Sequence, residues 1–186
     1  MDYFVMTRER GNAMKLLVFS DSHTDIETMA DAILHEQPQM VLHLGDHYGD
    51  ALSLRDRFPY IPMHFVMGNT DFFGSGETEQ VLKVEGRRLY MTHGHLFNVK
   101  NGLNTIYLKG RSVNADIVLF GHTHVPFNEE EQGFTLFNPG SCNLYGHGRA
   151  KPTYGCISIS SAGYDCRILE ARAYATYQGR QAEIRA

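Results

Sequence analysis

Five short polar motifs, each directly after an apolar run, constrain the fold of this chain more than any other feature. The runs cover residues 16–19, 40–44, 63–67, 88–91 and 117–120 and are rich in residues that favour β-strands. The motifs are Asp21-Ser22-His23, Gly45-Asp46, Gly68-Asn69-Thr70-Asp71, His93-Gly94-His95 and Gly121-His122-Thr123-His124. Binding sites in open α/β sheets form at the carboxyl ends of strands. The sequence therefore predicts one site assembled from five strand ends.

The side chains in these motifs have the donors of a divalent metal centre. The candidate ligands are Asp21, His23, Asp46, Asn69, His93, His122 and His124. This mixture of carboxylates, imidazoles and one amide suits borderline-hard ions, with Mn as the first expectation and Ni, Zn and Fe as alternatives. Seven donors exceed the four that a tetrahedral ion needs, so two ions fit better than one. Asp46 is the natural bridge, because one carboxylate can join two ions about 3.5–4 Å apart.

In this ordered set the sequence resembles the calcineurin-like metallophosphoesterase superfamily, and most closely its small single-domain bacterial and archaeal phosphodiesterases. The family order is D-x-H, G-D, G-N-[HCT]-[DE], H-G-H and G-H-[TS]-H, and all five blocks are present here. The resemblance spans roughly residues 14 to 170. A single D-x-H block would carry little information, whereas five blocks in order are specific.

The resemblance implies a division of the ligands and a reaction. Asp21, His23 and His124 would hold one ion, Asn69, His93 and His122 the other, and Asp46 would bridge them. The implied reaction is hydrolysis of phosphodiester bonds by a metal-bridging hydroxide that attacks phosphorus in line. Aryl phosphodiesters such as bis-p-nitrophenyl phosphate are the expected substrates in vitro. The chain has no G-x-S-x-G elbow and no Walker A sequence, so acyl transfer and nucleotide-driven phosphoryl transfer have little support.

Two further motif residues, Asp71 and His95, are predicted to take part in catalysis together with Asp46 and Asn69. His95 either touches the phosphate or supports the ligands from behind. Asp71 either orients a metal-bound water or a neighbouring histidine, or it is a solvated loop carboxylate.

Two histidines beside the second motif leave alternatives open. His43 lies inside an apolar strand run, where a histidine is more often a satisfied core group than a ligand. His47 follows the bridging aspartate and either contacts the substrate or faces solvent.

Thr70 departs from the pattern of many family members, which have a histidine after the metal-binding asparagine. That histidine stabilises the transition state or protonates the leaving group, and threonine is a poor proton donor. We therefore predict that activity favours esters with good leaving groups, such as aryl phosphodiesters, over alkyl monoesters.

The bulk properties are those of a globular enzyme domain. The chain has 186 residues, of which 42% are apolar and 20% charged, and this length favours one domain. A net charge of −4 argues against general nucleic-acid binding, although a diester from nucleic acid stays one possible substrate. The family resemblance implies a small-molecule phosphoester as the partner. An odd number of cysteines, with no C-x-x-C pair, predicts free thiols. No apolar run approaches the length of a membrane span and the N-terminus lacks a signal-peptide pattern, so we expect a cytoplasmic protein without membrane contact, and a homo-oligomer remains one alternative.

Periodicity predicts alternating strands and helices followed by hairpins. Strands are expected over 15–20, 40–44, 62–67, 79–84, 87–92, 116–120, 125–129, 133–137, 154–160 and 164–170, and helices over 25–37, 50–57 and 103–113. Thr24, with Glu27 three residues later, is the expected N-cap of the first helix. The family resemblance implies a four-layer α/β/β/α sandwich of two mixed sheets flanked by helices. The domain would span 14–170, between an extension over 1–13 and a tail or short helix over 171–186.

Two loops near the end of the domain have distinct expectations. Asn138-Pro139-Gly140-Ser141 is predicted to shape the backbone near the metals without supplying a ligand, with Gly140 at positive φ. Tyr145, His147 and Arg149 follow in a Gly-rich loop, where Arg149 either grips a phosphate or belongs to a solvated surface.

A non-catalytic protein-binding scaffold is the competing function, because the retromer cargo-sorting subunit resembles the same small family. That subunit departs from the motifs at metal positions, whereas every position here keeps a competent donor. A single structural metal is weaker still, because structural zinc favours closed Cys/His tetrahedra.

Overall fold

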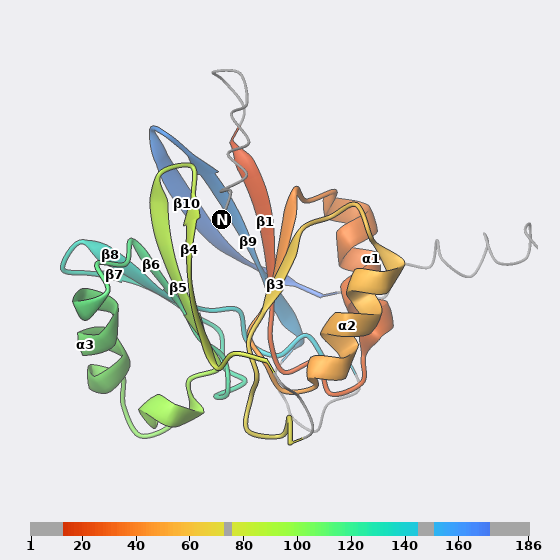
Figure 1. Ribbon diagram of the computed structural model, residues 1–186, viewed down its shortest axis with the longest axis horizontal. Coiled ribbons are helices and arrows are strands. Elements are labelled where there is room, and N and C mark those ends of the chain that lie inside the picture. Colours follow the sequence, from red (N-terminus) through yellow and green to blue (C-terminus); the bar gives the residue numbers. More distant parts are fainter. Residues whose placement is uncertain (1–12, 73–75, 145–150, 172–186) are drawn as a thin grey trace, which may run out of the picture.

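The strands of this protein build two five-stranded sheets that face each other (Figure 1). The structure is a computed structural model, which describes residues 13–72, 76–144 and 151–171. The first sheet has the order β10-β9-β1-β2-β3, with β1 (Met14–Phe19), β2 (Met40–His43), β3 (Met63–Phe65), β9 (Thr153–Ser160) and β10 (Gly163–Glu170). The second has the order β4-β5-β6-β8-β7, with β4 (Glu79–Val84), β5 (Arg87–Thr92), β6 (Ile117–Leu119), β7 (Phe127–Glu131) and β8 (Phe134–Asn138).

Three helices cover the outer faces of the sheets. Figure 1 shows α1 (Ile26–Glu36) and α2 (Tyr48–Arg57) beside the first sheet and α3 (Asn104–Ser112) beside the second. A short 3-10 turn, η1 (His95–Phe97), follows β5. The result is the predicted four-layer α/β/β/α sandwich.

The alternation of β1 shows how the sequence fills these layers. Leu16 and Val18 are fully buried in the cluster between the two sheets. Leu17 and Phe19 are equally buried on the opposite face, against Met29 of α1. Successive strand side chains point to opposite faces, so a run that is apolar throughout is required where both faces are covered.

Parallel pairing brings the motif-bearing ends of the strands together. Strand β2 runs parallel to both β1 and β3. In the second sheet β6 runs parallel to β5 and β8. Each of the five motifs follows one of these parallel strands, β1, β2, β3, β5 or β6, by no more than a few residues. The sheets therefore place all five motifs at carboxyl ends, as predicted.

The expected elements are present, and their ends differ by a few residues. Helix α2 begins at Tyr48 rather than at residue 50, and β3 is shorter than the predicted strand over 62–67. The hairpin turns at Glu85-Gly86 and Gln132-Gly133 have positive φ at both residues, which is typical of type I′ turns. The three cysteines are free, as predicted. The turn η1 was not predicted.

The predicted N-cap of α1 was wrong. Thr24 has φ 75° in the loop before the helix, and Asp25 is the cap. The Oδ1 atom of Asp25 accepts a hydrogen bond from the backbone N–H of Thr28 at 3.1 Å. The helix therefore begins one residue later than the Thr24–Glu27 spacing indicated.

Some predictions fall outside the described residues. These are the extension up to residue 12, the tail from residue 172, and Tyr145, His147 and Arg149. Among the described residues, no helix combines the length and the apolar character that crossing a membrane requires. The cytoplasmic location and the oligomeric state stay predictions.

Candidate metal centre

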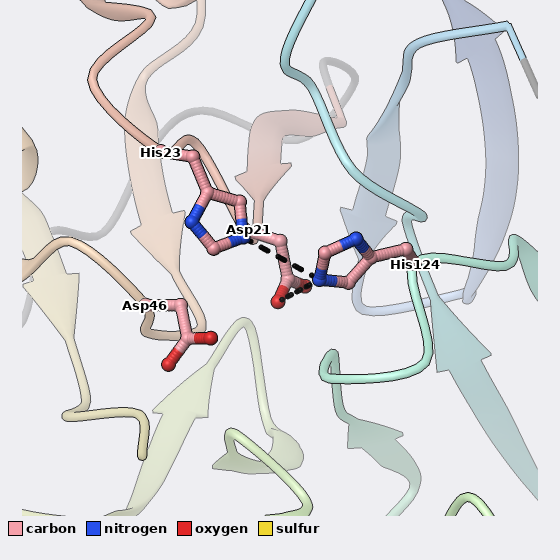
Figure 2. Close-up of side chains that lie close together, drawn as sticks. All are labelled: Asp21, His23, Asp46 and His124. Carbon is pink, nitrogen blue, oxygen red and sulfur yellow. Dashed lines mark hydrogen bonds and ion pairs between the residues drawn. The ribbon is translucent and has the colours of Figure 1, made fainter. Parts of the chain in front are cut away.

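Six of the seven predicted ligands form two overlapping groups at the carboxyl ends of the strands. The first group contains Asp21, His23, Asp46 and His124, and the second contains Asp46, His93 and His122. Within each group the ligand atoms lie within 4.8 Å of one another. Figure 2 shows the first group, in which the rings of His23 and His124 turn towards the Asp21 carboxylate. Asp46 belongs to both groups, which is the position expected of a bridging carboxylate.

One oxygen of the Asp21 carboxylate has no hydrogen bond from the residues that the structure describes. The side chain is fully buried, and its Oδ2 accepts from Ser20 Oγ at 2.6 Å and from the His122 N–H at 3.1 Å. Its Oδ1 has no hydrogen-bond partner, although Nε2 of His124 lies 3.1 Å away as an ion-pair contact. A buried carboxylate oxygen without a hydrogen bond is costly. A cation between Asp21 and His124 would remove that cost, so the residues fit a metal.

His93 is oriented as a metal ligand. Its Nδ1 lies 2.8 Å from the carbonyl oxygen of Leu44, which can only accept, so Nδ1 carries the hydrogen. In the neutral ring, Nε2 then has a lone pair that is available to a metal ion. It faces Asn69 Oδ1 at 3.2 Å and Asp46 Oδ1 at 3.3 Å. A carbonyl that fixes the ring of a ligating histidine is usual at metal sites, and Asn69, the seventh predicted ligand, joins the second group here.

The remaining imidazoles also converge. Nε2 of His23 and Nε2 of His124 lie 3.4 Å apart. The ring of His122 lies 5.0 Å from that of His93, measured between centroids. The two Nε2 atoms of His23 and His124 are close enough to bind the same cation.

The pKa values in the site are coupled through its buried charges. Burial and the neighbouring His93 lower the pKa of His122 to about 4, which keeps it in the neutral form that binds metals. Burial acts to raise the pKa of Asp46, but the hydrogen bond and charge of His93 outweigh it and hold that pKa below its usual range. Burial acts to lower the pKa of His93, and Asp46 and Asp21 reverse this, so that the pKa is raised.

Five of the candidate ligands have left-handed backbone conformations. The φ angles are 54° at Asp21, 42° at His23, 57° at Asp46, 68° at His122 and 60° at His124. Such conformations cost on the order of 1 kcal/mol or more each in residues other than glycine, and they cluster at functional sites. Contacts from the surrounding structure must therefore stabilise these loops in their strained conformation.

Two motif glycines are required by close packing around the carboxylates. A Cβ atom at Gly68 would collide with the backbone and side chain of Asp46. One at Gly121 would collide with the side chain of Ser20 and approach that of Asp21. These contacts explain why glycine precedes the ligands in two of the motifs.

Asp71 accepts hydrogen bonds from three backbone N–H groups. Its Oδ2 accepts from the N–H groups of Gly68 at 2.8 Å and Asp46 at 3.1 Å. Its Oδ1 accepts from the N–H of Tyr48, at the start of α2, at 2.7 Å. The carboxylate thus holds the Asp46 and Asn69 loops together, and its predicted role in catalysis stays a prediction.

Three histidines outside the two groups occupy different positions. The half-buried ring of His95 lies 5.4 Å from His93, and its buried Nδ1 has no hydrogen-bond partner among the described residues. The half-buried ring of His47 lies 5.2 Å from His23. His43 is buried, with both ring nitrogens hydrogen-bonded to Gly45 and Ser22, which fits the core-group interpretation.

Sequence reasoning missed Asp50 and the details of one loop. Asp50 accepts hydrogen bonds from Ser22 and Thr24, and nothing in its spacing sets it apart from other helix carboxylates. In the loop after β8, Asn138 donates to the Gly121 carbonyl and Ser141 donates to the Asp21 carbonyl. Gly140 has φ 77°, so this loop shapes the site as predicted.

Comparison with known proteins identifies relatives. Residues 14–162 match the model of the calcineurin-like phosphoesterase superfamily domain. The probable metallophosphoesterase YsnB of Bacillus subtilis is 35% identical over 136 residues, covering 70% of this chain and 76% of that protein. The phosphodiesterase YfcE of Escherichia coli is 41% identical over 158 residues, covering 70% and 80%. Wild-type Vps29 of Entamoeba histolytica complexed with zinc has a similar structure, with 20% identity, a TM-score of 0.66, and coverage of 84% and 99%.

Proposed function

We propose that this chain, which belongs to the calcineurin-like phosphoesterase superfamily, is a phosphodiesterase that works with two divalent metal ions. The relatives named as metallophosphoesterase and phosphodiesterase support the class of phosphoester hydrolase. The observation that carries the two-metal proposal is the place of Asp46 in both ligand groups. The buried Oδ1 of Asp21, which has no hydrogen bond from the described residues, supports it, because a bound cation would offset the cost of burying that oxygen. Mn is the ion we propose first, with Ni, Zn and Fe as alternatives.

The chain's own residues would position the substrate and the ions. When bound, two divalent ions neutralise charge on the phosphoryl oxygens and lower the pKa of the attacking water. Asp46 fixes the spacing of the two ligand groups. Asn69 Oδ1 and His93 Nε2, which lie 3.2 Å apart, would bind the second ion together with His122. The ring of His95 lies 5.4 Å from that of His93, and His95 is proposed to donate a hydrogen bond to a phosphoryl oxygen.

Exposed apolar residues that directly follow three of the motifs in the sequence support an aryl substrate. Three of the metal motifs are followed at once by a large apolar residue, namely Phe72, Leu96 and Val125. Their exposed fractions are 81%, 58% and 61%. Apolar side chains next to a charged centre suit an ester that joins a phosphate to a flat, apolar group. We therefore keep small aryl phosphodiesters as the proposed substrates in vitro.

Metal-dependent hydrolysis tests this proposal directly. Metal-stripped protein, resupplied with single metals, would be assayed with bis-p-nitrophenyl phosphate and p-nitrophenyl phosphate. We expect metal-dependent cleavage of the diester and a loss of about 100-fold or more in Asp46→Asn, which removes the bridging charge. Asp56→Asn is the matched control, because Asp56 is an exposed carboxylate of α2 and should leave activity unchanged. Turnover without metal, or a fully active Asp46→Asn variant, would contradict the two-metal proposal.

The dependence on the leaving group tests the role of Thr70. Its backbone N–H binds Asp46 Oδ1 at 3.1 Å, and its side chain is not an effective acid. We expect kcat/KM to fall steeply across a series of aryl phosphodiesters as the pKa of the leaving phenol rises. A Thr70→His variant, which supplies an acid, should flatten that slope. Equal rates across the series in the native protein would sink the idea.

The scaffold function remains the second candidate, because solved Vps29 structures share this fold. Their identity to this chain is 20–21%, so they support the fold alone. Binding of metal without turnover of any phosphoester would favour the scaffold.

A further inference from the structure

A buried chain of polar groups lies behind the first ligand group. His43, Ser22 and Asp50, which we call the His43 relay, are 1%, 0% and 7% exposed. Nε2 of His43 lies 3.1 Å from Ser22 Oγ, and Ser22 Oγ lies 2.7 Å from Asp50 Oδ2. None of the three is among the candidate metal ligands. The relay links β2, the loop after β1 and the first turn of α2.

The partners at the two ends of the relay fix the direction of its hydrogen bonds. The N–H of Gly45 points to Nδ1 of His43 at 3.2 Å, so Nδ1 accepts and the hydrogen of the neutral ring is on Nε2. Nε2 therefore donates to Ser22, whose hydroxyl is free to donate to Asp50. Asp50 Oδ2 also accepts from the N–H of Thr24 at 2.8 Å. Every donor in this buried chain has an acceptor, which makes the relay a rigid unit.

The relay holds the ligand His23 from both sides. Ser22 precedes His23 and Thr24 follows it, and both donate to the same oxygen of Asp50. This stretch is strained, because Asp21, His23 and Thr24 have φ angles of 54°, 42° and 75°. At its other end the relay binds the N–H of Gly45, next to the bridging Asp46. The two ligand-bearing loops are also joined by the Asp21 N–H, which donates to the Gly45 carbonyl at 3.1 Å.

We propose that the His43 relay is a positioning device for the first metal: it holds the strained Asp21–His23 loop in its binding conformation before the ion arrives. Ser22, His43 and Asp50 are positioning residues that act through the backbone of His23 and never touch the ion. Loss of the relay should therefore weaken the first metal position much more than the second, for which Asn69, His93 and His122 are the proposed ligands together with the shared Asp46. This inference rests on the proposed metal centre but not on its reaction.

Calorimetric titration of metal-free protein with Mn²⁺ tests the inference. The native protein should bind two equivalents. Ser22→Ala breaks the link between His43 and Asp50, and we expect the Kd of one equivalent to rise about 10- to 100-fold while the Kd of the other changes much less. Thr135→Val is the matched control, because Thr135 is also buried and its Oγ1 lies 3.1 Å from Tyr164 Oη, far from the metal motifs. That variant should lower stability to urea without changing either Kd.

A pair of variants at His43 separates positioning from general stability. His43→Gln keeps an N–H at the place of Nε2 and should retain tight binding of both equivalents. His43→Asn keeps an acceptor at the place of Nδ1 but is too short to reach Ser22, so it should behave like Ser22→Ala. Equal weakening of both equivalents, unchanged binding in Ser22→Ala, or the same Kd values in the Gln and Asn variants would overturn the inference. A native protein that binds no Mn²⁺ would overturn the proposed metal centre itself, whereas binding without hydrolysis would overturn only the proposed reaction.

Discussion

The buried imidazole of His43 makes the stability of this protein depend on pH. Burial lowers its pKa from 6.5 to about 4, and both ring nitrogens are hydrogen-bonded in the neutral form. Between these two values the unfolded chain binds a proton that the folded chain does not. The contribution of His43 to stability is therefore complete above pH 6.5 and is lost as the pH falls. The loss amounts to roughly 3 kcal/mol near pH 4.

Urea unfolding of the metal-free protein at pH 7 and pH 5 measures this contribution. Between these values the native protein should lose about 2 kcal/mol more stability than His43→Gln, which has no group that titrates in this range. Taking the difference between the two proteins removes the contribution of the other histidines. Parallel pH profiles for the two proteins would show that His43 does not carry the effect.

The roles of individual residues differed in how well the sequence predicted them. The candidate ligands could be proposed from the sequence because each lies within a few residues of the end of an apolar run, and a strand end can be predicted from one sequence. Asp50 could not be proposed in this way, because its partners Ser22 and Thr24 lie 28 and 26 residues away along the chain. Spacing also could not show that Asp71 would turn both carboxylate oxygens towards backbone N–H groups.

At the scale of elements, the start of α1 shows local sequence and site geometry in competition. The Thr24–Glu27 spacing indicates a capping box, but Thr24 is drawn into the left-handed loop that carries His23. Asp25 takes over the cap and accepts from the N–H of Thr28 and of Leu144, at 3.1 Å and 2.8 Å. We expect Asp25→Ala to cost about 1–2 kcal/mol in urea unfolding, and Thr24→Ala, at an exposed position, to cost much less. Equal losses of stability in the two variants would contradict the assignment of Asp25 as the cap.

The other elements followed from their patterns with two exceptions. Apolar runs and hairpin turns located the strands, because both are local signals. Strand β3 is shorter than its apolar run because the Met67 N–H leaves the sheet and donates to the Glu77 carbonyl at 2.8 Å. The turn η1 spans only His95–Phe97, which is too short to show a period.

At the scale of the whole molecule, the candidate metal centre lies where strand ends of both sheets meet. Asp21 and Asp46 follow β1 and β2 of the first sheet, whereas His93 and His122 follow β5 and β6 of the second. The order of strands, helices and hairpins, together with the family resemblance, predicted two packed sheets, but periodicity did not show that the second sheet begins at β4. The layered arrangement in Figure 1 explains why ligands from distant parts of the chain meet.

Because both sheets supply ligands, metal binding should stabilise the whole fold against unfolding. A ligand that binds only the folded state adds about 2.7 kcal/mol per site when its free concentration is 100 times its Kd. We expect Mn²⁺ to raise the free energy of unfolding by this order, and a chelator to reverse the gain. Asp46→Asn should lose most of the increment, since both ligand groups include Asp46, while Asp56→Asn should keep it. Chemical denaturation with and without Mn²⁺ measures the increment, and identical curves for the native protein would exclude a metal that joins the two sheets.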